Sequence, residues 1–294
     1  MKKMHGVITA MTTPFDAEGN VDVEGLKAQV NFAIEHGVDC LYPTGTTGEM
    51  YLMSVEERKL VARTVVEAAA GRVTVFIHVG SMKEEETVEL AIHAKEIGAD
   101  GIGVVTPSFF NVFERGMVGY YKRVGEAVGE DFPIYVYNIP QLAHNDITPE
   151  MLNAICEEVP NVVGIKYSFP DFHRLMDYRE CAGGRLSVLF GADDMFLPAL
   201  AVGCDGTVSG CSGPFPELFI AIRDKFNEGD MKGAYEAQKR ANKAVRIMKG
   251  GADMSIFKTI LAWRGVAAGY CRKPLTNLTE DEKAALRTQI EEFL

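Results

Sequence analysis

The sequence predicts an α/β protein built as a (β/α)8 TIM barrel with a C-terminal helical extension. Eight short β-rich runs alternate with helical segments as far as residue 214. Each run is almost continuously apolar, which is typical of parallel strands covered by helices. Eight such strands within about 220 residues favour closure into a barrel over an open, doubly wound sheet.

The strands are expected where β-branched and aromatic residues gather between glycine, proline and polar turn residues. In chain order they are residues 7–14, 40–45, 73–80, 101–107, 133–140, 161–168, 186–193 and 206–213. In a barrel of this kind the chemistry sits at the carboxyl ends of the strands. Side chains near the ends of these runs are therefore the candidates for a site.

Helices are expected between the strands because apolar residues recur there at helical spacing, bounded by cap and stop signals. One helix is expected to begin at Ser54, with Glu57 in the capping-box position. Ser81 and Glu84 repeat that spacing. A further helix is expected to begin after Thr148, which is followed by a proline in the first turn.

Beyond residue 214 the β signals stop and only helical patterns follow. The segments are residues 215–230, 231–250, 254–269 and 279–294, and no linker-like stretch separates them from the rest. The first of them completes the barrel. We therefore expect a barrel domain of residues 1–225 and a helical extension of residues 226–294 packed on it.

The composition excludes several classes of function. The formal net charge is −11 and no run of basic residues occurs, which argues against nucleic acid or anionic membranes as partners. No apolar run approaches a membrane span, and the apolar stretch near the N-terminus is too short and broken for a signal peptide. Six cysteines are scattered singly, which indicates reduced thiols and a cytoplasmic location. Small molecules and other subunits are the expected partners.

Lys166 lies near the end of an apolar, β-branched strand, where an ammonium group is rarely left unpaired. An internal ion pair is one explanation, yet no carboxylate stands at residue 77, 78 or 138 on other strand ends. Removing water from an ammonium group favours the neutral amine, the form that attacks carbonyl carbons. The position therefore favours a nucleophile.

The strand that carries Lys166 also shows how the lysine is accommodated. By period two, Val162 and Gly164 are expected on the inward face with Lys166, and Val163 and Ile165 on the face toward the helices. Gly164 has no side chain and so leaves space on the inward side of the lysine.

Two further strand ends carry candidate groups. The second ends in GTTGE, where Thr46 and Thr47 offer hydroxyls and the glycines offer backbone N–H groups that can converge on a small carboxylate. A glycine turn capped by threonines is the alternative. The fifth ends in YVYNIP, in which Tyr137 lies near the mouth and can transfer protons, although a tyrosine with a purely structural role is also possible.

The seventh strand ends in GADD. Asp193 and Asp194 can accept hydrogen bonds from a polyhydroxylated ligand, or can form the N-cap of the short helix that follows. The six histidines show no metal-ligand spacing, and no GxGxxG follows the first strand. Neither a metal site nor a dinucleotide site is predicted.

Taken in order, GTTGE, YNIP, GIK and GADD resemble the dihydrodipicolinate synthase/N-acetylneuraminate lyase family. The resemblance covers essentially the whole chain, and the combination of motifs is far more specific than any one of them. It implies a pyruvate-dependent class I aldolase on a (β/α)8 barrel, usually a homotetramer. It also implies no cofactor beyond a covalent Schiff base between lysine and pyruvate.

The resemblance also implies roles for single residues. Lys166 matches the Schiff-base lysine and Tyr137 the proton-transferring tyrosine. Thr46 and Thr47 match the two-hydroxyl motif that holds the pyruvate carboxylate and links to the tyrosine, and Thr47 is expected among the catalytic residues. Val208 matches an aliphatic position that lines the pyruvate end.

The branch of the family is indicated by fewer residues. The synthases usually carry an arginine, which grips the carboxylate of aspartate semialdehyde, where this chain has Leu142. The sialic acid lyases resemble this chain more closely than the synthases do in three motifs, which are HVG, CRKP and the Gly-x-Asp-acid pattern that begins at Gly191. Ser168 keeps the hydroxyl of their threonine. Ser168, Gly191 and the two aspartates of GADD are expected to bind substrate.

Some positions depart from the lyase pattern. Asp194 stands where the lyases usually have glutamate, and Gly210 aligns with a serine. Phe109 and Phe110 occupy the loop in which both branches place tyrosines, one of which reaches into the neighbouring subunit. A phenylalanine cannot relay a proton, so either water substitutes or the substrate differs.

These features predict a Schiff-base lyase that reversibly cleaves an N-acetylneuraminate-like 2-keto-3-deoxy sugar acid to pyruvate and an aldehyde. Dihydrodipicolinate synthesis and a keto-acid dehydratase on the same Schiff base are the alternatives. A non-catalytic keto-acid sensor would need neither Lys166 nor Tyr137, and both are present.

Overall fold

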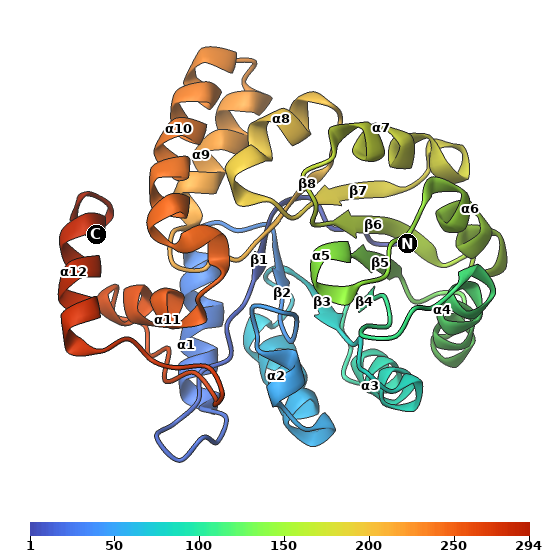
Figure 1. The fold of residues 1–294 in the computed structure, drawn as a ribbon, viewed down its shortest axis with the longest axis horizontal. Helices are drawn as coiled ribbons and strands as arrows, with labels where there is room; N and C mark the ends of the chain where they lie inside the picture. Colours follow the sequence, from blue (N-terminus) through green and yellow to red (C-terminus); the bar gives the residue numbers. More distant parts are fainter.

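A computed structural model describes residues 1–294. Eight parallel strands pair in chain order, and β1 pairs with β8 to close the sheet. The predicted (β/α)8 barrel is therefore confirmed (Figure 1). The strands are β1 Gly6–Ala10, β2 Cys40–Tyr42, β3 Thr74–His78, β4 Gly101–Val105, β5 Ile134–Asn138, β6 Val162–Tyr167, β7 Ser187–Phe190 and β8 Gly206–Ser209.

The strands are shorter than the predicted runs, although all but Gly6 of β1 lie inside them. The last residues of each run leave the ladder and form the loops at the barrel mouth. After β2, for example, Pro43 has no N–H to donate to a ladder. The polar ends of the runs are therefore placed in loops, where they are free to contact a ligand.

Twelve α-helices surround the barrel or follow it (Figure 1). They are α1 Val23–Glu35, α2 Val55–Ala69, α3 Glu84–Glu96, α4 Glu114–Val128, α5 Pro140–Ala143, α6 Pro149–Glu158, α7 Phe172–Glu180, α8 Phe196–Ala201, α9 Pro216–Asn227, α10 Met231–Ile247, α11 Met254–Trp263 and α12 Glu280–Ile290. None of them is long and apolar enough to span a membrane.

Two of the three predicted helix starts are confirmed. Ser54 and Glu57 form a reciprocal capping box at the start of α2, and Thr148 accepts a hydrogen bond from the backbone of Met151 at the start of α6. The capping box predicted for Ser81 and Glu84 is wrong, because α3 begins only at Glu84 and has no side-chain cap.

Residues 81–83 of that segment form the turn that leads away from β3. The N–H of Ser81 donates to the Thr87 hydroxyl, and the Ser81 hydroxyl donates to Glu86 at 2.6 Å. Glu84 pairs instead with Arg123 of α4. The acidic residue that reaches back to Ser81 therefore lies two positions later than the capping-box spacing predicts.

The barrel has an inner core and an outer core. Ten buried residues fill the inside of the barrel, and a larger cluster lies between strands and helices. The predicted faces of β6 are wrong at Val162 and Val163, because the pairing with β5 shifts by one residue between Ile134 and Tyr135. Val163 packs in the inner cluster and Val162 in the outer one. Beyond this bulge the alternation is as predicted, with Ile165 in the outer cluster.

Helices α10 to α12 form the C-terminal segment, which we define as residues 231–294. Figure 1 shows these helices, in orange to red, grouped on one side of the barrel, with α10 alongside α9. Helix α9 runs to Asn227 and so crosses the predicted boundary between residues 225 and 226. The division into a barrel domain and an extension stays a prediction.

Arg272 attaches this segment to the barrel. Its guanidinium donates to both carboxylate oxygens of Glu57 at 2.8 and 2.7 Å, to the Leu52 carbonyl at 2.8 Å and to the Gly19 carbonyl. A bidentate pair of this kind is geometrically specific. These hydrogen bonds from Arg272 hold the pKa of Glu57 at about 2, below its usual 4.5.

Glu57→Gln is therefore expected to lower the melting temperature by several degrees at pH 7. Because the folded-state pKa of Glu57 is depressed, its contribution is complete above pH 4.5 and is lost as the pH falls toward about 2. The difference between variant and wild type should shrink over that range in thermal melts at decreasing pH. Glu56→Gln, which alters an exposed pair with Lys59, is the control. A Glu57→Gln difference that stays constant down to pH 3 would contradict this account.

Candidate active site

A cavity of about 400 Å³ opens at the carboxyl ends of the strands. Side chains from β5, β6 and β8 reach it, together with the loops after β2 and β7 and part of the C-terminal segment. Eighteen residues line it: Ala10, Thr46, Thr47, Tyr137, Ile139, Gln141, Leu142, Lys166, Ser168, Gly191, Asp193, Val208, Gly210, Gly250, Gly251, Ala252, Met254 and Phe257. The fold therefore brings together every predicted site residue except Asp194.

Lys166 lies on the inner face of β6 and is 6% exposed. Its Nζ is 3.9 Å from the centre of the Tyr137 ring and 5.1 Å from that of Tyr42. No carboxylate lies within 4.0 Å of this nitrogen, so the internal ion pair is wrong as an explanation for the lysine. The Lys166 nitrogen therefore packs against aromatic rings and makes no hydrogen bond within the protein.

Gly164 does not leave the empty space that the sequence suggests. A Cβ at Gly164 would lie 2.4 Å from the Tyr135 ring, so the ring of Tyr135 fills this part of the barrel. The hydroxyl of Tyr135 accepts a hydrogen bond from the Met4 backbone at 2.9 Å. Tyr135 is therefore part of the floor under Lys166 and is fully buried.

Tyr137 lies one layer above Tyr135, beside Lys166. Its ring packs edge to face on His78, with ring centres 5.8 Å apart. Its hydroxyl makes no hydrogen bond within the protein, and Tyr137 lines the cavity. Neither Thr46 nor Thr47 forms a hydrogen bond with this hydroxyl in the structure, so the link that the resemblance implies stays a prediction. The Tyr137 hydroxyl is thus available to a bound molecule.

His78 and Tyr42 complete the wall behind the lysine. The His78 Nδ1 lies 3.0 Å from the Thr44 carbonyl, which can only accept, so Nδ1 carries the hydrogen. Burial first, and then the positive charge of Arg58, hold the pKa of His78 well below its usual range. Burial raises the pKa of Tyr42 well above its usual value, and its hydroxyl has no partner. Both side chains are therefore neutral near pH 7.

The loop that carries Thr46 and Thr47 is strained at both ends. Thr44 has a φ of 59° and Glu49 a φ of 60°, a left-handed conformation that favours glycine. Each such residue costs on the order of 1–3 kcal/mol unless neighbouring groups hold it. The Thr44 hydroxyl donates to the His78 carbonyl at 2.8 Å, which fixes the first end of the loop.

On the opposite side of the cavity, Gly191 makes room for a hydroxyl. A Cβ at Gly191 would lie 2.0 Å from the Ser168 Oγ, so only glycine lets that hydroxyl occupy its position. The side-chain N–H of Gln141 donates to the Ser168 carbonyl at 2.6 Å and holds the end of β6 against α5. Ser168 therefore presents its hydroxyl to the cavity on a fixed backbone.

The two aspartates of GADD lie in different places. Asp193 lines the cavity, and its Oδ2 accepts a hydrogen bond from the Cys211 N–H at 3.2 Å. Its other oxygen is buried without a partner, and burial raises the pKa of this carboxyl. Asp194 is exposed and does not line the cavity. Neither residue caps α8, which begins at Phe196 after a short turn, so that alternative is wrong.

Several lining residues were not predicted from the sequence. Gln141 could have been suspected, since it stands beside Leu142 in the short helix α5 that follows β5. Residues 250–252 and Phe257 belong to the C-terminal segment, and no motif places them at the barrel mouth. Leu142 lies at the rim and is 58% exposed. No cluster of three or more His, Cys, Asp or Glu side chains is arranged to hold a metal ion.

Comparisons with known proteins agree with this geometry. The model of the dihydrodipicolinate synthetase family matches residues 3–293. An uncharacterized DapA-like lyase of Halobacterium salinarum is 35% identical over 98% of this chain and 93% of its own. The N-acetylneuraminate lyase of Mediterraneibacter gnavus is 31% identical over 96% and 90%. The crystal structure of dihydrodipicolinate synthase from Aquifex aeolicus superposes with a TM-score of 0.92 at 31% identity, covering 99% and 98%.

Proposed function

This chain belongs to the dihydrodipicolinate synthetase family, and from that premise we propose that it reversibly cleaves a 2-keto-3-deoxy sugar acid to pyruvate and an aldehyde. Members of the family are pyruvate-dependent lyases and aldolases that use a lysine Schiff base. The proposed substrate is similar to N-acetylneuraminate. No cofactor is proposed beyond the lysine itself.

The observation that carries this choice is the set of charges in the cavity. Lys166 is the only basic side chain among the eighteen lining residues, and Asp193 is the only acidic one. The carboxylate of the keto acid is assigned to the Thr46 and Thr47 loop. A second carboxylate, as in aspartate semialdehyde, would meet Leu142 and no second cation. An uncharged, hydroxylated aldehyde fits better, since Ser168, Gln141 and Asp193 offer it hydrogen-bonding groups.

The proposed reaction begins when the neutral amine of Lys166 attacks C2 of the keto acid and water leaves, which forms an imine. Tyr137 gives its proton to the departing water, and its phenolate then takes the proton of the C4 hydroxyl as the protonated imine accepts the electron pair of the C3–C4 bond. The aldehyde departs, and the remaining enamine is protonated at C3. Hydrolysis then releases pyruvate and regenerates the amine of Lys166.

The other predicted residues are proposed to bind substrate in this scheme. Thr46, Thr47 and Val208 contact the pyruvate end, and Ser168 and Asp193 contact the hydroxyl groups of the aldehyde end. Gly191 acts by leaving space for Ser168. A contact from Asp194 has no support from its position, because Asp194 lies outside the cavity lining.

We also propose a homotetramer in the cytoplasm. The loop after β4 exposes three phenylalanines, with exposed fractions of 74% for Phe109, 69% for Phe110 and 83% for Phe113. A patch of exposed aromatic rings supports burial against another subunit. The proposal of a cytoplasmic location is supported by the six cysteines placed singly along the sequence.

The test begins with pyruvate and borohydride, which should leave one reduced adduct on Lys166 of the folded protein. N-acetylneuraminate, 2-keto-3-deoxygluconate and aspartate semialdehyde are then compared as substrates. A lyase yields pyruvate plus an aldehyde, whereas a dehydratase yields one product that keeps all the carbons. An unmodified Lys166 would overturn the mechanism.

Dihydrodipicolinate synthesis is the second candidate, because proteins named 4-hydroxy-tetrahydrodipicolinate synthase match this chain at 30–37% identity, beside 31% for the N-acetylneuraminate lyase. Condensation of pyruvate with the semialdehyde at a rate above sugar-acid cleavage would show that the charge argument is wrong. Comparison of Leu142→Arg with the wild type gives a matched check. The variant should gain activity toward the semialdehyde if a second cation is what the cavity lacks.

A further inference from the structure

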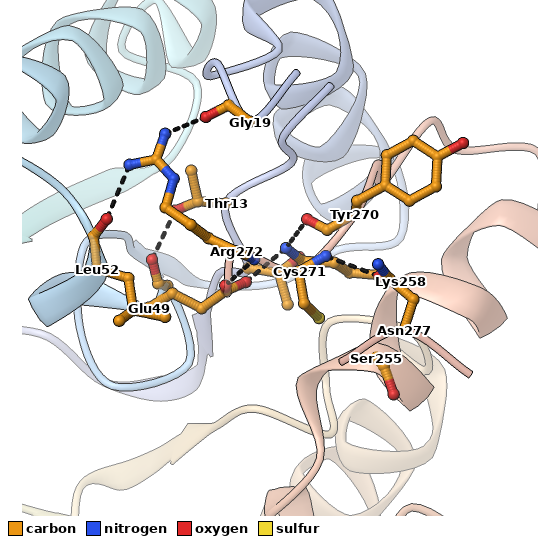
Figure 2. Close-up of polar contacts among 12 residues, drawn as sticks. Thr13, Gly19, Glu49, Leu52, Ser255, Lys258, Tyr270, Cys271, Arg272 and Asn277 are labelled. Carbon is orange, nitrogen blue, oxygen red and sulfur yellow. Dashed lines mark hydrogen bonds and ion pairs between the residues drawn. The ribbon is translucent and has the colours of Figure 1, made fainter. Parts of the chain in front are cut away.

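The loop of residues 44–49, which we call the substrate loop, is held at its second strained end by residues from the far end of the chain. Figure 2 shows the carboxylate of Glu49 next to both Lys258 of α11 and the backbone of Arg272. The Lys258 Nζ donates to one oxygen of Glu49 at 2.5 Å, and the Arg272 N–H donates to the other at 2.8 Å. Both carboxylate oxygens are therefore occupied by the C-terminal segment.

This contact is fully shielded from water. The side chain of Glu49 is 0% exposed and that of Lys258 is 2% exposed. The Lys258 Nζ also donates to the Tyr270 carbonyl at 2.6 Å and lies 4.8 Å from the centre of the Phe15 ring. A buried ion pair gives little net stability compared with an apolar contact of the same volume. Its hydrogen bonds do fix direction, which an apolar contact does not.

Apart from the contacts of Glu49 and Thr44, one further side chain forms a hydrogen bond with this loop. The Gly48 carbonyl accepts one hydrogen bond from the Thr13 hydroxyl at 2.9 Å. Within the loop, the N–H groups of Gly48 and Glu49 donate to the Gly45 and Thr46 carbonyls at 3.0 Å. The turn that presents Thr46 and Thr47 is thus fixed by His78 at one end and by Glu49 at the other.

Helix α11 also approaches the cavity from a second direction. Phe257, the residue before Lys258, lines the cavity, and its ring lies 3.0 Å from the position of a Cβ on Gly210. The Thr47 Oγ1 lies 3.2 Å from the same position. Of two consecutive residues of α11, Lys258 therefore contacts the loop at its glutamate, and Phe257 lines the same cavity as Thr47.

We propose that Glu49 and Lys258 are positioning residues, through which the C-terminal segment holds Thr46 and Thr47 in the geometry that binds the keto-acid carboxylate. The identity of that ligand rests on the proposed function, whereas the restraint on the loop does not. The C-terminal segment is then a working part of the active site rather than an appended helical layer.

Four variants test this proposal. Glu49→Gln and Lys258→Met each break the ion pair, and the double variant Glu49→Gln/Lys258→Met removes both charges, so that no buried charge is left alone. Arg264→Met is the matched control. It removes an ion pair between the end of the same helix and Glu217, and it does not touch the loop.

Two measurements are made on each variant beside its melting temperature. Hydrogen exchange of residues 45–52 reports on the restraint of the loop, whatever the ligand is. The pyruvate concentration that half-saturates borohydride trapping reports on carboxylate binding. Glu49→Gln and Lys258→Met should speed loop exchange and raise the half-saturating concentration by about tenfold, while trapping at saturating pyruvate stays complete. Arg264→Met should lower only the melting temperature.

The double variant separates position from stability. Its melting temperature should recover relative to Lys258→Met, while loop exchange and half-saturation stay raised. Recovery of loop exchange and of the half-saturating pyruvate concentration to wild-type values in the double variant would overturn the proposal. The proposal would also be overturned if loop exchange in the single variants were no faster than in Arg264→Met. If pyruvate and borohydride do not modify the wild type, the proposed function is wrong. The restraint on the loop is then tested by the hydrogen-exchange rates alone.

Discussion

Replacement of Lys166 by methionine is expected to abolish lyase turnover and borohydride trapping while leaving the protein at least as stable as the wild type. The loss in kcat should be roughly 10⁴-fold or more, because a covalent nucleophile acts together with its site and has no substitute. No other lysine lines the cavity. Trapping should fall to background for the same reason.

The expectation about stability follows from the surroundings of Lys166. Its nitrogen lies over two aromatic rings and pairs with no carboxylate. A methionine of similar length would leave no opposite charge behind, and its sulfur would contact the rings of Tyr42 and Tyr137 favourably. The variant exchanges a buried amino group that has no hydrogen-bond partner for an apolar group, and so removes the cost of keeping that group out of water.

Lys258→Met is the matched comparison, because it makes the same substitution at another buried lysine. Here the Glu49 carboxylate would lose its cation inside the protein, and breaking a buried pair in this way typically costs about 3–5 kcal/mol. Melting temperatures of the two variants should therefore move apart. A Lys166→Met protein as unstable as Lys258→Met would show that Lys166 has a structural role that its contacts do not reveal.

Comparison of these two lysines also shows which functional residues can be predicted from the sequence and which cannot. Lys166 was predicted as a reactive group because it interrupts an apolar strand run and the run ends at the barrel mouth. Lys258 stands in a helical segment, where a lysine usually lies on the solvated face. Nothing local marks its partner, since Glu49 is more than two hundred residues away in the chain. Such a contact depends on how the C-terminal segment packs.

The barrel itself was predictable because each strand and helix carries its own local pattern. The errors arose where the local structure depends on the contact between two elements. The bulge at Val163 depends on the register between β5 and β6, which neither strand specifies alone. The Ser81 error arose because a turn, and not a cap, was needed after β3. Asp193 and Asp194 lie in one short 3₁₀ turn, which places only the first of them at the cavity. The GADD motif contains both aspartates and does not indicate which one faces the cavity.

Tyr137→Phe is expected to lower kcat by about 10²- to 10⁴-fold, the usual range for loss of a general acid–base group. Its hydroxyl opens on the cavity and has no protein partner, so its removal should change the melting temperature little. Lys166 should still be trapped by pyruvate at high concentration, though more slowly. The KM for the keto acid should change much less than kcat, because the carboxylate is assigned to the threonine loop.

Tyr42→Phe makes the comparison decisive. Tyr42 faces the same lysine, with its ring centre 5.1 Å from the Nζ, yet its hydroxyl is buried and lacks a partner. Burial holds its pKa well above the usual range, so this phenol is a poor proton carrier. Its loss should leave kcat within a few-fold and can stabilise the protein, because an unsatisfied buried hydroxyl is removed. If Tyr42→Phe were as damaging as Tyr137→Phe, proton transfer would have to run through the barrel interior and not through the cavity.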